Sequence, residues 1–271
     1  MAIVKIGVVK IGGAEGNRLE PLASELAARV ASGEKWVVVH GASGVMDKLC
    51  RERGVEIRMI TSPSGYRSRF VGETERALFE EAALAYGASV KRALEVSGAH
   101  GEQLTPQASG VRAKRKDVVR ENAGGRVRIV RGNYSGTVEG VDANAILAAM
   151  EGAIPIMPPL GYDRESGLGI NIDGDRLAAA VSAALPADVM IILSNVPGLM
   201  KDVNDPESRI KTGSLKNWDA LEHYAQGNMK RKLLACGEAL EGGVRSVYLA
   251  DGRVENPIGR ALGGDATCLV R

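Results

Sequence analysis

The sequence contains few aromatic residues and few cysteines. Phe, Trp and Tyr make up only 4% of its 271 residues, too few for a protein that works mainly by stacking on nucleic-acid bases. Its three cysteines are an odd number without a Cys-x-x-Cys pair. This excludes a disulfide framework and a structural zinc site, and it is typical of a reducing, cytoplasmic compartment. No apolar run reaches about 18 residues, so we expect neither a membrane span nor a signal peptide.

Several common signatures of nucleotide and metal sites are also missing. The chain has no Gly-x-x-x-x-Gly-Lys-Ser/Thr loop, no Gly-x-Gly-x-x-Gly at its first helix, and neither the His-Arg-Asp nor the Asp-Phe-Gly motif of protein kinases. Its three histidines, His40, His100 and His223, are too few for us to expect a metal cluster or a Ser/His/Asp triad. A phosphate-binding site in this chain must therefore be built in another way.

Apolar periodicity predicts an α/β protein. Residues 3–11 are β-branched and almost continuously apolar, which predicts a buried strand of a parallel sheet. Residues 19–30 then place Leu and Val at helical spacing, and residues 36–39 form a second apolar strand. A strand–helix–strand unit at the start of the chain predicts a largely parallel sheet.

The rest of the chain continues this alternation, and we expect a single domain over residues 1–271. A hairpin is predicted over 109–138, and a change between two lobes near residue 172, so that 1–172 and 173–271 share one sheet. Asp173 and Asn228 are the predicted N-caps of two helices. Further helices are expected at 73–96, 142–151 and 257–262, and further strands at 154–157, 188–193, 246–250 and 267–270.

Four loops that follow or adjoin these strands are rich in Gly, Ser or Asn. In an open α/β sheet, ligands bind beyond the carboxyl ends of the strands, and such loops can present backbone N–H groups to an anion. One such loop alone is usually only a turn, but four together favour an anion site. The loops contain Lys10–Gly13, His40–Gly44, Asn171–Asp175 and Ser194–Gly198.

The charged residues near these loops point to phosphoryl transfer. Lys10 lies in an apolar strand, where a charge is costly unless it is paired, and Asp175 is a candidate partner. Lys230, Arg231 and Lys232 begin a helix, where the dipole disfavours cations. Either solvent screens them or an anion lies between them and the helix. Lysines, backbone amides and one carboxylate suit an ATP-dependent kinase whose acceptor is a carboxylate, which needs no general base.

One segment is strongly basic, although the net charge of the whole chain is only +2. Residues 111–132 contain eight Lys or Arg and two acidic residues. This segment is a solvated hairpin, a docking site for an acidic partner, or a nucleic-acid site. The lack of aromatic residues in the segment favours a protein partner over nucleic acid.

The motifs above resemble those of the amino acid kinase family in order and spacing, over essentially the whole chain. Within the family, the sequence is most similar to the acetylglutamate kinase branch, and there to the group that phosphorylates α-aminoadipate or glutamate attached to the carrier protein LysW. Asn195 favours that group, because ordinary acetylglutamate kinases usually have Asp there. The more specific matching segments are 62–69, 131–138, 194–198 and 250–257.

The resemblance implies a fold and a role for each matching residue. The fold is a three-layer αβα sandwich with a largely parallel sheet, as in carbamate kinase. Lys10 would stabilise the transferring phosphoryl group from the acceptor side and Lys232 from the nucleotide side, while Asp175 holds both lysines. The other implied contacts are to the reacting oxygens (amides of Gly12, Gly13, Gly41 and Ala42), to the α-carboxylate side of the substrate (Arg69 and Asn171), and to the nucleotide (Ser194, Asn195, Gly198, Met229 and Lys230).

The resemblance also implies cofactors and partners. ATP would be the phosphoryl donor, and Mg²⁺ would bridge its phosphates instead of occupying a protein metal site. The enzyme would be a homodimer and would bind LysW, a small acidic protein, beside the substrate mouth. The basic hairpin then gains a function in docking through Lys114, Arg115, Lys116, Arg126 and Arg128.

Two other functions remain open on the sequence. One is phosphorylation of free N-acetylglutamate, and the other is a catalytically silent protein that senses a nucleotide or an amino acid. Ala42 favours the silent protein, because the family usually has Gly there and an alanine fits only where the backbone does not need a positive φ. The intact Lys10, Lys232 and Asp175 argue against it.

Overall fold

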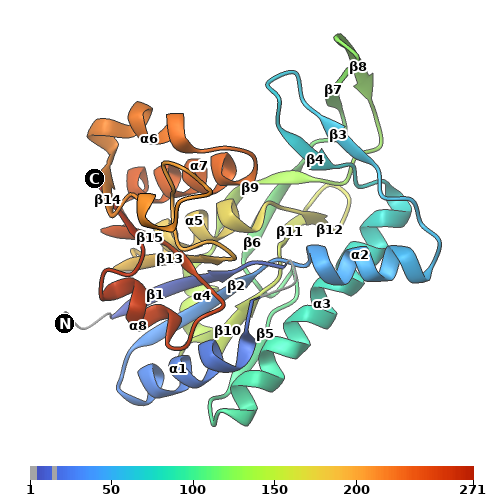
Figure 1. Cartoon of the computed structure of the whole chain (residues 1–271). Helices are drawn as coiled ribbons and strands as arrows, with labels where there is room; N and C mark the ends of the chain where they lie inside the picture. The colour runs from blue at the N-terminus through green and yellow to red at the C-terminus, as the bar shows by residue number, and fades with distance from the viewer. Residues whose placement is uncertain (1–4, 14–16) are drawn as a thin grey trace.

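An eight-stranded sheet forms the centre of the computed structural model, which describes residues 5–13 and 17–271 (Figure 1). Only β15 and β16 pair antiparallel, and every other neighbouring pair is parallel. The predicted, largely parallel sheet is therefore confirmed. The strands lie in the order β14 (Thr212–Ser214), β16 (Thr267–Val270), β15 (Ser246–Asp251), β13 (Val189–Ser194), β1 (Ile6–Ile11), β2 (Lys35–His40), β10 (Ile154–Met157) and β5 (Gly101–Gln103).

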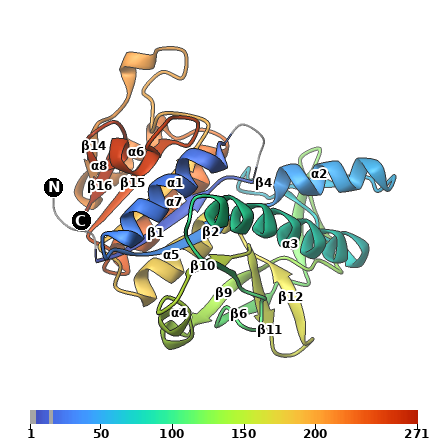
Figure 2. The ribbon, with the colours of Figure 1, turned by 90° about the horizontal axis from the view of Figure 1, so that it is seen from below.

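Helices cover both faces of this sheet, which makes the three-layer sandwich (Figure 2). Neighbouring residues of a strand point to opposite faces, so Val9 packs in one core and Val8 in the other. The core with Val9 contains side chains of α1 (Leu19–Ala31), α3 (Glu73–Val96) and α8 (Pro257–Leu262). The core with Val8 contains side chains of α4 (Ala143–Ala149), α5 (Gly174–Ala184) and α7 (Asn228–Glu241).

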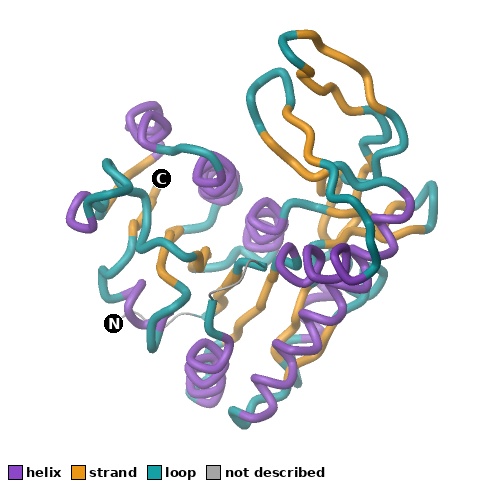
Figure 3. The backbone as a smooth tube through the Cα atoms, turned by 45° about the vertical axis from the view of Figure 1, so that its right-hand side comes forward, coloured by secondary structure: helices purple, strands orange, loops and turns teal. Residues whose placement is uncertain are grey.

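A second sheet and two hairpins lie beside the central sheet, near α2 (Ser43–Glu52). The hairpins project upward together from the body of the molecule (Figures 1 and 3). One hairpin is formed by β3 (Met59–Thr61) and β4 (Arg67–Arg69), and the other by β7 (Val119–Ala123) and β8 (Arg126–Val130). The second sheet has the order β12 (Leu168–Asn171), β11 (Leu160–Asp163), β6 (Val111–Arg115) and β9 (Gly136–Val141).

The basic hairpin predicted over 109–138 is split in two. Its inner strands are β7 and β8, whereas its outer strands, β6 and β9, pair with each other inside the four-stranded sheet. The buried Asn133 lies where the two pairs separate, and its amide nitrogen donates to the carbonyls of Lys116 and Ser135. A side chain that bonds to the backbone in this way replaces the ladder hydrogen bonds at the break.

Most predicted elements are present, and the differences have local causes. The Asp173 cap is confirmed, because its side chain accepts from the amides of Asp175 and Arg176. The Asn228 cap is wrong: Gly227, at φ 51°, is the N-cap, and Asn228 is the first helical residue. Strands of three residues show no periodicity, so β3, β4, β5 and β14 have no signal in the sequence. The helix α6 (Trp218–Tyr224) was also not predicted.

Among the described residues, none of the helices combines the length and the apolar character that a membrane crossing needs.

Candidate active site

Two lysines meet on one buried carboxylate beside β1, in the middle of the eight-stranded sheet. The Nζ atom of Lys10 lies 2.7 Å from Oδ1 of Asp175, and Nζ of Lys232 lies 3.1 Å from Oδ2 of the same residue. The side chains of Lys10 and Asp175 are only 8% and 9% exposed, and that of Lys232 is 15% exposed. The predicted pairing of Lys10 with Asp175 is therefore present, and Lys232 joins it.

The fold explains why these three residues meet. Lys10 alternates with Val8 on β1 and so points to the face that α5 and α7 cover. Asp175 lies in the first turn of α5, just after the cap at Asp173, and Lys232 lies in the first half of α7. Because α5 and α7 pack against each other on this face, their side chains converge beside the carboxyl end of β1.

The charges in this cluster depend on one another. Burial alone would raise the pKa of the Asp175 carboxyl, but the charges of Lys10 and Lys232 outweigh burial and hold this pKa at about 2. Burial, and then the charge of Lys10, lowers the pKa of the Lys232 ammonium below its ordinary value. Two ammonium groups against one carboxylate leave a net positive charge, which suits an anionic ligand.

Two glycine-containing loops touch each other next to Lys10. A Cβ atom on Gly13 would lie 2.2 Å from the nitrogen of Ala42, and one on Gly41 would lie 2.5 Å from the nitrogen of Gly13. Neither position can therefore carry a side chain. The carbonyl of Gly13 accepts from the amide of Gly44 at 2.7 Å. The four predicted amide residues, Gly12, Gly13, Gly41 and Ala42, are thus brought together.

The backbone of Ala42 does not need a glycine. Its φ of −140° is open to any L residue, so the alanine leaves the loop unstrained. Ala42 is the N-cap of α2, and its side chain is buried. Ala42 therefore does not favour a catalytically silent protein.

The two residues predicted to contact the α-carboxylate side of the substrate, Arg69 and Asn171, each have a polar partner of their own. A guanidinium nitrogen of Arg69, on β4, pairs with Asp47 of α2. Its Nη1 atom is buried and has no hydrogen-bond partner among the described residues. The amide nitrogen of Asn171, at the end of β12, donates to Oγ of Ser135 at 3.3 Å. Arg69 therefore keeps an unused donor of the kind that binds a carboxylate.

A cavity of about 440 Å³ opens beside Lys232, between α7 and the loops after β13 and β15. Of the residues predicted to bind the nucleotide, Asn195, Gly198 and Met229 line it. Ser194 does not line it, and neither does Lys230, which is exposed. Gly12 and Gly13, which are predicted to contact the phosphoryl oxygens of ATP through their amides, do not line it either. The further lining residues are Val196, Pro197, Leu199, Met200, Val203, Tyr224, Gln226, Asn228, Lys232, Asp251 and Arg253.

Asp251 and Arg253 were not among the predicted site residues. The Asp251 carboxylate holds the guanidinium of Arg253 at 2.7 Å, and both residues line the cavity. Asp251 ends β15, so it follows a strand as the other loops do, and this position was the signal that could have found it. Tyr224 and Gln226 gave no such signal, because they precede a helix in a segment without a strand.

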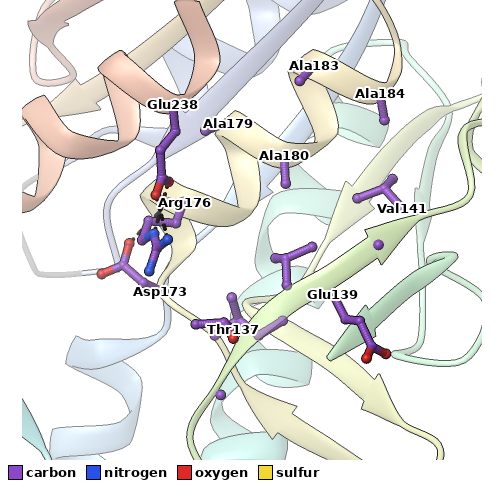
Figure 4. Close-up of a pocket in the computed structure, with 14 residues that line it drawn as sticks. Thr137, Glu139, Val141, Asp173, Arg176, Ala179, Ala180, Ala183, Ala184 and Glu238 are labelled. Atoms are coloured by element: carbon purple, nitrogen blue, oxygen red, sulfur yellow. Dashed lines mark hydrogen bonds and ion pairs between the residues drawn. The ribbon is translucent and has the colours of Figure 1, made fainter. Parts of the chain in front are cut away.

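A second cavity, of about 360 Å³, lies between α5 and β9 (Figure 4). Four alanines of α5, among them Ala179 and Ala183, face it, but Lys10, Asp175 and Lys232 do not line it. At one end, the guanidinium of Arg176 donates to Glu238 of α7 through two nitrogens. This paired contact ties α5 to α7 and so supports the meeting of Asp175 with Lys232.

The residues predicted for docking fall into two groups. Lys114, Lys116 and Arg126 are exposed. Arg115 lies 3.6 Å from the ring centre of Tyr134 and pairs with Asp117, while Arg128 pairs with Glu121 at 2.7 Å. The Glu121 carboxylate is largely buried and also contacts Arg58 of the neighbouring hairpin. Arg115 is half-buried and Arg128 is exposed, but both are paired within the segment, so Lys114, Lys116 and Arg126 are the predicted docking cations without an acidic partner among the described residues.

Replacing Asp175 by Asn tests the buried cluster. The variant leaves two buried ammonium groups without their counter-charge, so we expect the free energy of unfolding at pH 7 to fall by about 3–5 kcal/mol. The pKa of Asp175 is about 2 in the folded protein, against about 3.9 for an unfolded Asp. The stability that Asp175 adds is therefore complete above about pH 4 and lost as the pH falls towards 2.

Urea unfolding of both proteins between pH 7 and pH 2 measures this effect. The difference in the free energy of unfolding between wild type and Asp175→Asn should be constant down to about pH 4 and should become smaller below it. A difference in the free energy of unfolding that stayed constant down to pH 2 would contradict the lowered pKa of Asp175 in the folded protein.

Similar solved structures share this fold at low sequence identity. The N-acetylglutamate synthase of Neisseria gonorrhoeae superimposes with a TM-score of 0.80 and 23% identity, over 98% of this chain and 59% of the synthase chain. The present chain thus corresponds to only part of that synthase. Carbamate kinase of Giardia lamblia superimposes with a TM-score of 0.66 and 16% identity, over 98% of each chain.

Sequence comparison identifies closer relatives. The LysW-aminoadipate kinase of Deinococcus radiodurans is 37% identical over 98% of this chain and 91% of its own length. The enzyme of the same name from Thermus thermophilus is also 37% identical, over 96% of this chain and 98% of its own length. The sequence profile of the amino acid kinase family matches residues 5–251. The chain therefore belongs to the amino acid kinase family and is a phosphotransferase.

Proposed function

We propose that this enzyme transfers the γ-phosphoryl group of ATP to the side-chain carboxylate of α-aminoadipate, or of glutamate, carried by LysW. The product is an acyl phosphate, formed in lysine or arginine biosynthesis. The observation that carries the proposal is the Lys10–Asp175–Lys232 cluster, which lies between the glycine loops and the cavity lined by Asn195 and Met229. The names of the relatives, LysW-aminoadipate kinase, supply the acceptor.

The cluster suits this reaction because the acceptor carboxylate is already a nucleophile at neutral pH. Catalysis then requires that the two reactants be held in line and that negative charge be stabilised as the phosphoryl group moves. Lys10, on the side of the glycine loops, would meet the charge from the acceptor side. Lys232, at the cavity, would meet it from the nucleotide side. Asp175 fixes both ammonium groups in place before the substrates bind.

Mg²⁺ would enter bound to the phosphates of ATP, and this is also part of the proposal. Both oxygens of Asp175 are already engaged by lysines, so this carboxylate does not fit as a metal ligand. Among the described residues, no group of three His, Cys, Asp or Glu side chains is placed to hold a metal ion. Bound to ATP, the ion would neutralise part of the phosphate charge.

The carrier explains the exposed cations of the basic segment. A carrier joined to the α-amino group also blocks this amine, which would otherwise attack the acyl phosphate. Lys114, Lys116 and Arg126 are exposed and positive, and they would attract an acidic carrier to this side of the molecule. We further propose a cytoplasmic homodimer, which is the arrangement that the resemblance implies.

Turnover of ATP with three acceptors tests the proposed function. The acceptors are LysW-linked α-aminoadipate, LysW-linked glutamate and free N-acetylglutamate. We expect turnover with a carrier-linked acceptor and little with the free one, and the ratio of the two carrier-linked rates assigns the pathway. Preferred turnover of free N-acetylglutamate would contradict the proposal, and so would inactivity with all three acceptors.

Charge reversal on the basic segment tests the docking. With Lys116→Glu and Arg126→Glu combined, we expect KM for the carrier-linked acceptor to rise about 3–10-fold at low salt, because the attraction that guides encounter is reversed. The difference should shrink as salt is raised, since salt screens exposed charges over about 10 Å at 0.1 M.

A matched control has the same change in net charge elsewhere. Arg92 and Lys216 are both exposed, and Arg92→Glu with Lys216→Glu should leave KM unchanged. An equal rise in KM for the two double variants would show that only net charge matters and would reject docking on this segment.

A further inference from the structure

His40 is a fully buried ionisable residue next to the catalytic cluster, and the mechanism above leaves it without a function. It is the last residue of β2, and its exposed fraction is 0%. Its ring lies 5.3 Å from that of Tyr86 on α3. A Cβ atom on Gly87 would lie only 3.1 Å from His40 Nε2, so α3 packs against the imidazole without spare room.

The contacts of the ring fix its tautomer. The Nδ1 atom lies 3.0 Å from the carbonyl oxygen of Gly41. A carbonyl oxygen only accepts hydrogen bonds, so Nδ1 must carry the proton and donate. The Nε2 atom is buried and has no partner among the described residues. A proton there would be a buried, unpaired donor, so the ring is neutral with Nε2 unprotonated.

The hydrogen bond from His40 acts on the loop that adjoins Lys10. The amide of Gly41 donates to the carbonyl of Ile11 at 3.0 Å, which anchors one side of this residue to β1. The Nδ1–H group anchors the carbonyl on its other side. A peptide group is planar and trans, so fixing the Gly41 carbonyl also fixes the direction of the Ala42 N–H. Ala42 is one of the residues whose amides are expected to contact the reacting oxygens.

We propose that His40 is a positioning residue, whose Nδ1–H group holds the Gly41–Ala42 peptide so that the Ala42 amide points at the reacting carboxylate and phosphoryl group. This inference rests on the proposed phosphoryl transfer. It assigns the imidazole no contact with substrate and no proton transfer. A hydrogen-bond donor is effective in stabilising a transition state only if it is already oriented before the reaction.

The surroundings of His40 keep it in the required neutral form. Burial and, to a smaller extent, the charge of Lys10 lower the pKa of its imidazole to about 4, against the opposing effect of the bond to Gly41. The other ionisable group at the ring, Tyr86, has its pKa raised by burial to about 12. Neither group changes its charge between pH 5 and pH 9.

Nitrogen NMR of the enzyme labelled with ¹⁵N-histidine tests the tautomer without any acceptor. The His40 signals should show a protonated Nδ1 and an unprotonated Nε2, and they should not titrate between pH 5 and pH 9. Protonation of Nε2 instead, or titration near pH 6.5, would overturn the proposal. This result does not depend on which acceptor the enzyme uses.

Three variants of His40 then test the positioning. Asn places an amide nitrogen where Nδ1 stands, so His40→Asn keeps the donor, whereas His40→Gln places it near Nε2 and His40→Leu has none. We expect His40→Asn to keep kcat within about 5-fold, and the other two to lose about 10–100-fold. KM for ATP should stay unchanged in all three, because His40 does not line the nucleotide cavity.

A matched control separates positioning from stability. Gln103 is a partly buried polar residue on β5. Like His40, it packs against Gly87 of α3, because a Cβ atom added to Gly87 would lie only 2.7 Å from the amide nitrogen of Gln103. It donates to the carbonyl of Leu84 and not to the loop. Gln103→Leu should lower the melting temperature and keep kcat.

If His40→Leu behaves like Gln103→Leu, or if all three His40 variants lose kcat equally while folded, His40 is only structural. A wild type inactive with every acceptor would instead reject the proposed function.

Discussion

The site depends on one buried carboxylate, Asp175, which holds two lysines that come from different parts of the chain. Without it, Lys10 and Lys232 would repel each other in a poorly solvated space. With it, the two ammonium groups are fixed near each other, and the three residues together carry one net positive charge. In the proposed phosphoryl transfer to a carboxylate, these lysines would supply fixed positive charge on both sides of the moving group.

The fold brings this carboxylate to Lys10 because α5 packs against β1, which pairs with β13 in the middle of the sheet. The sheet continues across this pair, so Lys10 on β1 faces the two helices α5 and α7 on the same side. The ion pair of Arg176 with Glu238 joins these helices. On the other side of Lys10, the glycine loops and His40 set the direction of backbone amides. The site is thus built largely from rigid elements, and its precision comes from packing.

Much of this could be predicted from the sequence, because long apolar strands and helices have clear periods and Lys10 is costly unless paired. The convergence of Lys232 on Asp175 depends on tertiary packing, so it rested on resemblance. Short strands such as β3 and β4 gave no signal, and ion pairs such as Arg128 with Glu121 depend on strand register that the sequence does not reveal. The concern over Ala42 could be resolved only by its backbone angles.

The most direct test is to replace Lys10 by Met and to make two measurements on the variant and on wild type. One is the rate of phosphoryl transfer in a single turnover, and the other is the affinity for ATP. Methionine keeps most of the length of lysine and removes the charge. Lys10 does not line the cavity proposed for the nucleotide, so we expect an unchanged Kd for ATP and a loss of about 10²–10³-fold in the transfer rate. A transfer rate within about threefold of wild type would contradict the central part assigned to the Lys10–Asp175–Lys232 cluster.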